Sequence, residues 1–198
     1  MRTLLFVLAI FSAALPAAAQ PPRAQITPAT ADAVAAGSST RLALSVSLPP
    51  GLHVQADQPR DPSLIPTVLT VDAPAGVRVT HLIYPQPEDF TLEGEKVPLL
   101  VFDSQFVVGA AISVDASVAP GELKIPGRFR YQACDDKMCF QPRTERFEWT
   151  LRVVAPGTAT PGSGSAAVFV RNMPSENHRP RSSALTIAPS TMVNSPLS

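Results

Sequence analysis

Residues 41–48 read RLALSVSL, and this stretch decides the fold class of the chain. Leucine or valine occupies every even-numbered position, while arginine and the small residues alanine and serine fill the odd ones. A period of two places one set of side chains on each face of an extended strand, so the pattern predicts a half-buried β-strand. The sequence Pro-Pro-Gly at 49–51 then ends it.

The same signals recur on either side of this stretch. Turn-forming residues separate further apolar runs, and outside the first 20 residues no segment keeps the period of an amphipathic helix. Short strands are expected at 52–56, 66–72, 77–84, 97–102, 106–118, 127–133 and 147–153. Roughly seven to nine strands, with a turn about every 8–12 residues, predict an all-β sandwich.

Residues 1–19 have the three parts of a secretory signal peptide. Arg2 supplies a positive charge, residues 4–15 are almost continuously apolar, and Ala17 and Ala19 are the small residues that a signal peptidase reads. The run is shorter than the roughly 20 apolar residues that a transmembrane helix needs. We therefore expect cleavage after Ala19, export to the periplasm, and no transmembrane segment in the mature chain.

Composition divides the remainder into three parts. Residues 20–39, rich in proline, alanine and threonine, are expected to form an entry arm, and residues 40–155 the folded domain. Residues 156–198 are a low-complexity tail with too little apolar material to order, so disorder is predicted there. Lysine plus arginine and aspartate plus glutamate balance at 16 each. This balance disfavours nucleic acid and anionic membranes as partners.

The segment with chemical content is YQACDDKMCF, residues 131–140, which holds both cysteines of the chain. In an oxidising compartment, two cysteines are expected to form one disulfide, here Cys134–Cys139. Two strands joined by a tight turn can bring their Cα atoms within the roughly 4.4–6.8 Å that a disulfide needs. So short a ring adds little stability, which keeps thiol–disulfide exchange open beside the commoner structural hairpin disulfide.

The charges around the cysteines do not activate them. Asp135 and Asp136 disfavour a thiolate beside Cys134, whereas Lys137 favours it. If exchange occurs, a partner protein is expected to supply the activation or the geometry.

A copper site is the alternative from a different class. Cupredoxin-like sites use cysteine, histidine and methionine in an exported β-sandwich. Here Met138 precedes Cys139, and His53 and His81 lie upstream, but no histidine stands between the cysteine and the methionine. Lone histidines of this kind are more often core or surface residues, so neither a metal nor another cofactor is expected.

Over about residues 51–153 the chain resembles the periplasmic N-terminal domain of the thiol:disulfide interchange protein DsbD. The Tyr-Gln-x-Cys strand end with a second cysteine shortly after it is the most specific feature of the resemblance. The matching pieces are GLHV at 51–54, PRDPSLIPT at 59–67, Tyr84-Pro85, and YQAC at 131–134 with Cys139. The best-known members have one more residue between the cysteines.

The resemblance implies an immunoglobulin-like β-sandwich that acts as a thiol–disulfide oxidoreductase. Reducing equivalents would arrive from a thioredoxin-like donor and pass to disulfide-isomerase-like acceptors. By the same resemblance, Cys139 would be the attacking thiol and Cys134 the resolving one, with Tyr131 in support. The loop 85–96 would act as a cap that shields the sulfurs through Phe90. The alternative is a non-enzymatic binding module whose disulfide only staples a hairpin.

Overall fold

The computed structural model describes residues 22–158, and every regular element within that range is a strand. No helix among these residues has the length and apolarity to cross a membrane. The expected signal peptide at 1–19 and all but the first residues of the expected tail at 156–198 lie outside the described residues. The strands are β1 (Gln25–Thr30), β2 (Val34–Ala35), β3 (Ser39–Ser47), β4 (His53–Gln55), β5 (Val68–Val71), β6 (Val77–Ile83), β7 (Glu88–Phe90), β8 (Leu99–Phe102), β9 (Gln105–Val114), β10 (Gly121–Tyr131), β11 (Ala133–Cys134) and β12 (Arg143–Val154).

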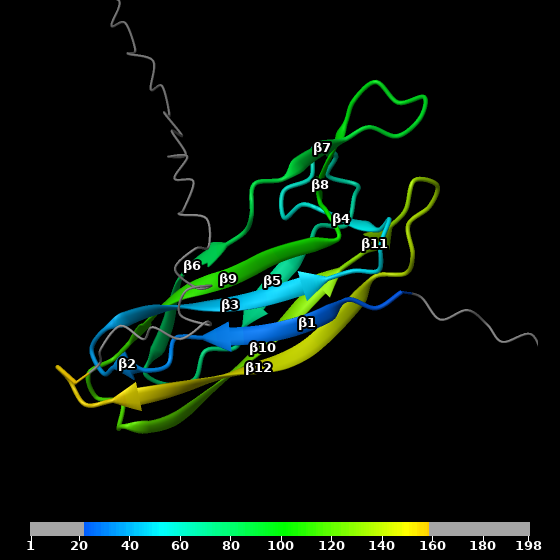
Figure 1. Ribbon diagram of the computed structural model, residues 1–198. Helices are drawn as coiled ribbons and strands as arrows, with labels where there is room; N and C mark the ends of the chain where they lie inside the picture. The colour runs from blue at the N-terminus through cyan, green and yellow to red at the C-terminus, as the bar shows by residue number, and fades with distance from the viewer. Residues whose placement is uncertain (1–21, 159–198) are drawn as a thin grey trace, which may run out of the picture.

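Two four-stranded sheets pack face to face as a sandwich, as Figure 1 shows. One has the strand order β1-β3-β9-β6 and the other β2-β12-β10-β5. Neighbouring strands are antiparallel except β2 and β12, which run parallel. A third, smaller sheet with the order β11-β4-β8-β7 lies at one end of the sandwich (Figure 1). The predicted all-β, immunoglobulin-like fold is confirmed.

The alternation that opened the sequence analysis has a direct structural counterpart in β3. Leu42, Leu44 and Val46 are buried in the main core between the two sheets. Ala43 points to the other face, where it is also buried in a small cluster with Ile83. Because β3 lies between β1 and β9, both of its edges are paired, and it is one of the two inner strands of this sheet.

One tryptophan joins the two sheets through a hydrogen bond. Trp149 on β12 is fully buried, and its Nε1 donates to the carbonyl oxygen of Ala43 on β3 at 2.7 Å. Its ring meets the ring of Phe147 edge to face, with centroids 4.6 Å apart. Gly127 lies opposite Phe147 on β10, where a Cβ atom would stand 2.6 Å from that ring. Glycine at this position therefore leaves room for the aromatic pair.

Several segments differ from the expected pattern. The expected strand at 106–118 ends at Val114, and the expected strand at 147–153 begins at Arg143. The expected arm at 20–39 contains β1 and β2; β1 pairs along six residues of β3 and is an edge strand, where Pro28 is tolerated. The expected loop at 85–96 contains β7. β10 begins at Gly121, earlier than expected, and continues through Pro126. The Pro126 carbonyl accepts a hydrogen bond from the amide of Asp72, just beyond the last pair of β10 with β5. The ring nitrogen of Pro126 faces the same side, where the ladder has ended and no backbone donor is needed.

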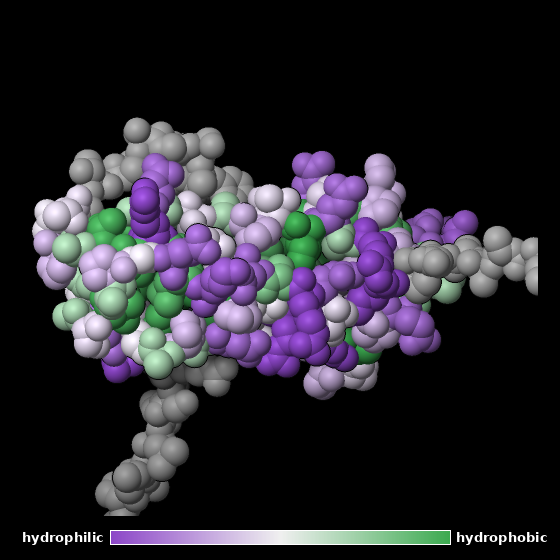
Figure 2. Space-filling model, turned by 90° about the horizontal axis from the view of Figure 1, so that it is seen from below, coloured by the Kyte–Doolittle hydropathy of each residue, from purple (hydrophilic) through white to green (hydrophobic). Residues whose placement is uncertain are grey.

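The surface mixes charged, polar and apolar side chains, as one face in Figure 2 shows. This agrees with the equal numbers of acidic and basic residues in the chain. Three large hydrophobic side chains in the described part are exposed, namely Leu82, Val97 and Met138.

Candidate functional site

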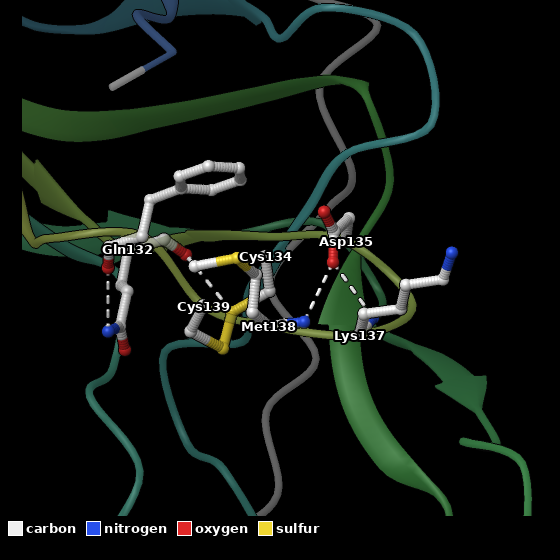
Figure 3. Close-up of a disulfide and its surroundings, with 7 residues drawn as sticks. Gln132, Cys134, Asp135, Lys137, Met138 and Cys139 are labelled. Atoms are coloured by element: carbon white, nitrogen blue, oxygen red, sulfur yellow. Dashed lines mark hydrogen bonds between the residues drawn. A yellow bond between two sulfur atoms is a disulfide. The ribbon is translucent and has the colours of Figure 1, made fainter. Parts of the chain in front are cut away.

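The two cysteines form a disulfide across a β-hairpin that extends from the small sheet. Cys134 ends β11 and forms an isolated antiparallel bridge with Cys139 (Figure 3). The sulfurs are bonded at 2.04 Å, and the two Cα atoms are 4.0 Å apart. The predicted pairing of Cys134 with Cys139 is thus present in the structure.

Backbone hydrogen bonds on both sides of the disulfide fix this hairpin. The Asp135 amide donates to the Met138 carbonyl at 3.0 Å, and the Phe140 amide donates to the Ala133 carbonyl at 2.8 Å. The cysteines therefore occupy the position between two hydrogen-bonded pairs, where an antiparallel ladder brings opposite side chains closest together. A further bond runs from Gln132 Nε2 to the Phe140 carbonyl at 2.9 Å. The backbone itself brings the sulfurs within bonding distance.

The turn of the hairpin is organised by a carboxylate. Asp135 Oδ1 accepts hydrogen bonds from the amides of Lys137 at 2.8 Å and Met138 at 2.7 Å (Figure 3). These two backbone bonds lower the pKa of Asp135, so the side chain stays ionised at neutral pH. A fixed negative charge next to Cys134 disfavours its thiolate, as the sequence indicated.

The two cysteines differ sharply in exposure. Cys134 is buried, with 1% of its surface accessible, whereas Cys139 is exposed. The Cys134 sulfur also lies 3.9 Å from the carbonyl oxygen of Gln132, which favours a thiol over a thiolate in the reduced state. An incoming protein thiolate can reach Cys139 from solution and cannot reach Cys134. This asymmetry agrees with the assignment of Cys139 as the attacking thiol.

Tyr131 belongs to the core beside the site. Its side chain is fully buried and its ring lies 5.4 Å from that of Phe129, centroid to centroid. The hydroxyl accepts a hydrogen bond from the backbone amide of Ala24 at 2.7 Å. Burial raises the pKa of Tyr131. Tyr131 thus ties the segment before β1 to the end of β10, just before the cysteine hairpin.

His53 is the site residue that the sequence interpretation did not select. A turn at 49–52 leads into β4; the Leu52 amide donates to the Pro49 carbonyl, and Gly51 has a φ of +79°, as the third position of a type II turn requires. His53 is the next residue, and it pairs with Cys134 across the small sheet. Only 5% of its surface is accessible. The sequence signal that could have identified His53 is its position in the GLHV motif at 51–54.

Phe90 lies over this histidine. The two ring centroids are 4.2 Å apart, with the ring planes tilted by 39°. Burial lowers the pKa of His53, and the nearby carboxylates of Asp103 and Asp135 partly oppose that effect. Phe90 therefore covers the residue that pairs with Cys134, and its shielding of the sulfurs stays a prediction.

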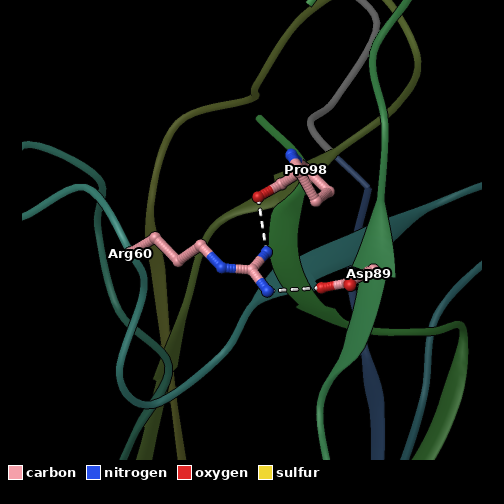
Figure 4. Close-up of polar contacts among 3 residues, drawn as sticks. All are labelled: Arg60, Asp89 and Pro98. Atoms are coloured by element: carbon pink, nitrogen blue, oxygen red, sulfur yellow. Dashed lines mark hydrogen bonds and ion pairs between the residues drawn. The ribbon is translucent and has the colours of Figure 1, made fainter. Parts of the chain in front are cut away.

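An arginine bridges the two legs of the β7–β8 hairpin, which contains most of the loop expected as a cap. Arg60 Nη2 donates to Asp89 Oδ1 at 2.7 Å, and Nη1 donates to the carbonyl oxygen of Pro98 at 2.6 Å (Figure 4). Asp89 is in β7, and Pro98 immediately precedes β8, so one guanidinium bridges the two legs of the loop. Because Arg60 and Asp89 are both exposed, the pair contributes only about 0–1 kcal/mol.

The small sheet also buries an amide without a hydrogen-bond partner. Gln55 has 1% of its surface accessible, and neither Oε1 nor Nε2 is hydrogen-bonded to any described residue. It lies two residues after His53 on β4, so both side chains point to the same face of the strand. Polar groups thus line the face that carries Cys134.

Metal binding finds no support in the described part of the chain. Within residues 22–158, no group of three or more histidine, cysteine, aspartate or glutamate side chains is arranged to hold a metal ion. His81 lies on β6, in a different sheet from His53, and both cysteines are engaged in the disulfide.

The model of the family "Thiol:disulfide interchange protein DsbD, N-terminal" matches residues 22–151. The chain belongs to this family. The DsbD N-terminal domain is a periplasmic, immunoglobulin-like domain of thiol–disulfide interchange, and it interacts with thioredoxin-like proteins in general. The matched range begins before β1, so the DsbD domain includes the segment expected as an entry arm. No curated protein matches the sequence.

Proposed function

We propose that this chain is a periplasmic carrier of reducing equivalents that works through the Cys134–Cys139 pair. The observation that carries the proposal is the unequal exposure of the two cysteines in a member of the DsbD N-terminal family. A disulfide with one accessible and one buried sulfur directs an attacking thiolate to a single atom, the Sγ of Cys139. Exchange at one defined sulfur is what a carrier needs to pass electrons without side reactions.

The proposed cycle consists of two exchanges, each through a mixed disulfide. A donor thiolate attacks Cys139 Sγ, the Cys134–Cys139 bond breaks, and Cys134 leaves with the electron pair and takes up a proton. The donor's second thiolate then attacks the donor sulfur that is bonded to Cys139, which forms the donor disulfide and releases reduced Cys139. In the second half, the Cys139 thiolate attacks the disulfide of an acceptor, and Cys134 resolves the mixed disulfide. Two electrons move in each half.

We further propose that a thioredoxin-like protein is the donor and a disulfide-isomerase-like protein the acceptor. The cap loop and the cysteine hairpin project from the same end of the sandwich (Figure 1). An exposed apolar side chain accompanies each, Val97 directly after the cap loop and Met138 in the hairpin, with 66% and 57% of their surfaces accessible. Exposed apolar groups on the hairpin and beside the cap loop support a protein surface as the partner.

A structural staple is the second candidate, favoured by one observation. The backbone hydrogen bonds on both sides of the disulfide hold Cys134 and Cys139 opposite each other, so the bond fits a regular hairpin of the fold. Such a pair would hold a loop of a non-enzymatic binding module and exchange with nothing.

The two candidates are separated by the redox equilibrium of the pair. The mature domain is equilibrated against a graded glutathione series, alkylated, and read by mass. A carrier is expected to have a potential above about −300 mV, which is typical of exchange-active pairs. The variant Cys134→Ser should trap a mixed disulfide at Cys139, whereas the matched variant Cys139→Ser should trap little because Cys134 is buried. A pair that stays oxidised below this potential and traps nothing would establish the structural staple.

A further inference from the structure

The buried member of the pair has no obvious route for its proton. To resolve a mixed disulfide, Cys134 must attack as a thiolate. It has 1% of its surface accessible, so water has little access to the thiol. The ionised Asp135 beside it and the carbonyl of Gln132 at 3.9 Å both favour the protonated thiol. Unaided resolution should therefore be slow at neutral pH.

We propose that His53 accepts the proton of Cys134 as that thiol resolves the mixed disulfide; this inference rests on the proposed carrier function. The two residues are direct partners in the antiparallel pairing of β4 with β11. Residues opposite each other in such a pair share one face of the sheet, with Cβ atoms about 4.5–5.5 Å apart. The fold thus places a titratable imidazole beside the buried thiol, in addition to the ionised carboxylate of Asp135.

The surroundings of His53 suit a proton acceptor. Burial lowers the pKa of His53, so the imidazole is neutral at neutral pH and free to take a proton. The carboxylates of Asp103 and Asp135 attract the imidazolium that forms. From β7 the histidine meets the uncharged ring of Phe90, while the neighbouring Asp89 is paired with Arg60.

The step balances in atoms and electrons. The Cys134 S–H proton moves to a ring nitrogen of His53, and Cys134 Sγ forms a bond to Cys139 Sγ. The bond between Cys139 and the acceptor sulfur breaks, and the acceptor leaves as a thiolate with the electron pair. That thiolate takes the proton from the His53 imidazolium, which returns to its neutral form. The cysteine pair is oxidised by two electrons and the acceptor is reduced by two.

The test follows a single turnover of the reduced protein with oxidised glutathione. Acid quenching and mass analysis report both the mixed disulfide at Cys139 and its resolution, from about pH 5.5 to pH 9. For His53→Gln we expect resolution to slow by at least about tenfold at pH 7, a threshold set below the roughly 10²–10⁴-fold typical of general bases. The mixed disulfide should accumulate, while its rate of formation stays unchanged. The matched variant His81→Gln, on β6, should behave as the parent.

The pH profile distinguishes a base from a structural role. In the parent, resolution should fall as the pH drops through the value at which His53 titrates by NMR in the same reduced protein. In His53→Gln, the rate of resolution should instead stay low at neutral pH and rise only as the pH approaches the ordinary pKa of a thiol, about 8.5. A parent profile that does not follow the His53 titration would overturn the inference even if the variant failed to fold. Unchanged resolution in a folded His53→Gln would do the same and leave the carrier function intact. A parent that forms no mixed disulfide would instead refute the carrier function.

Discussion

At the scale of single residues, Asp135 has two effects on the site. Its carboxylate caps the turn by accepting two backbone hydrogen bonds, and its charge lies beside Cys134. Asparagine keeps an oxygen that can accept the same bonds and removes the charge. The two roles can therefore be separated by one substitution.

Asp135→Asn is expected to make the reduced pair more reactive without unfolding the hairpin. Removing a nearby negative charge favours the thiolate, so alkylation by iodoacetamide at pH 7 should accelerate by about three- to tenfold. The neighbouring Asp136→Asn is the control, because Asp136 is exposed and holds none of the turn bonds that Asp135 accepts. Equal rates in both variants and the parent would show that the Asp135 charge does not influence the sulfurs.

At the scale of elements, the β7–β8 hairpin that we propose as a cap is short and is held by weak contacts. β7 pairs with β8 over three residues, Phe90 packs on His53, and Arg60 bridges the two legs. An exposed ion pair of this kind contributes little to overall stability. Its effect should therefore be visible in how often the cap opens rather than in global unfolding.

Arg60→Ala is expected to speed reduction of the disulfide by dithiothreitol by up to about fivefold, which corresponds to the upper limit of about 1 kcal/mol for such a pair. Phe90→Ala should increase the rate of reduction by more than Arg60→Ala does, because it removes the covering ring itself. Arg128→Ala is the matched control, because Arg128 makes a comparably exposed ion pair with Asp72 at 2.9 Å, between β10 and the end of β5. A rate for Phe90→Ala equal to that of the parent would remove Phe90 from the cap.

At the scale of the whole molecule, the sequence predicted those parts whose signals are local. The alternation at 41–48 predicted a half-buried strand, and the short spacing of the two cysteines predicted the hairpin disulfide. β1 could not be read in this way, because it is an edge strand containing Pro28 and depends on its register with β3. His53 was missed for a similar reason. Its partner Cys134 is distant in sequence, and only the pairing of β4 with β11 brings the two together.

The same long-range assembly assigns Tyr131 a role that can be measured. Its hydroxyl accepts the amide of buried Ala24, so Tyr131→Phe leaves that N–H without its partner. An unpaired buried donor costs about 1–3 kcal/mol, and we expect a loss of this size in the free energy of unfolding, measured with urea. The redox potential and the rate of mixed-disulfide formation at Cys139 should not change, because the hydroxyl bonds to the segment before β1. A shifted potential at unchanged stability would instead mean that Tyr131 takes part in the exchange.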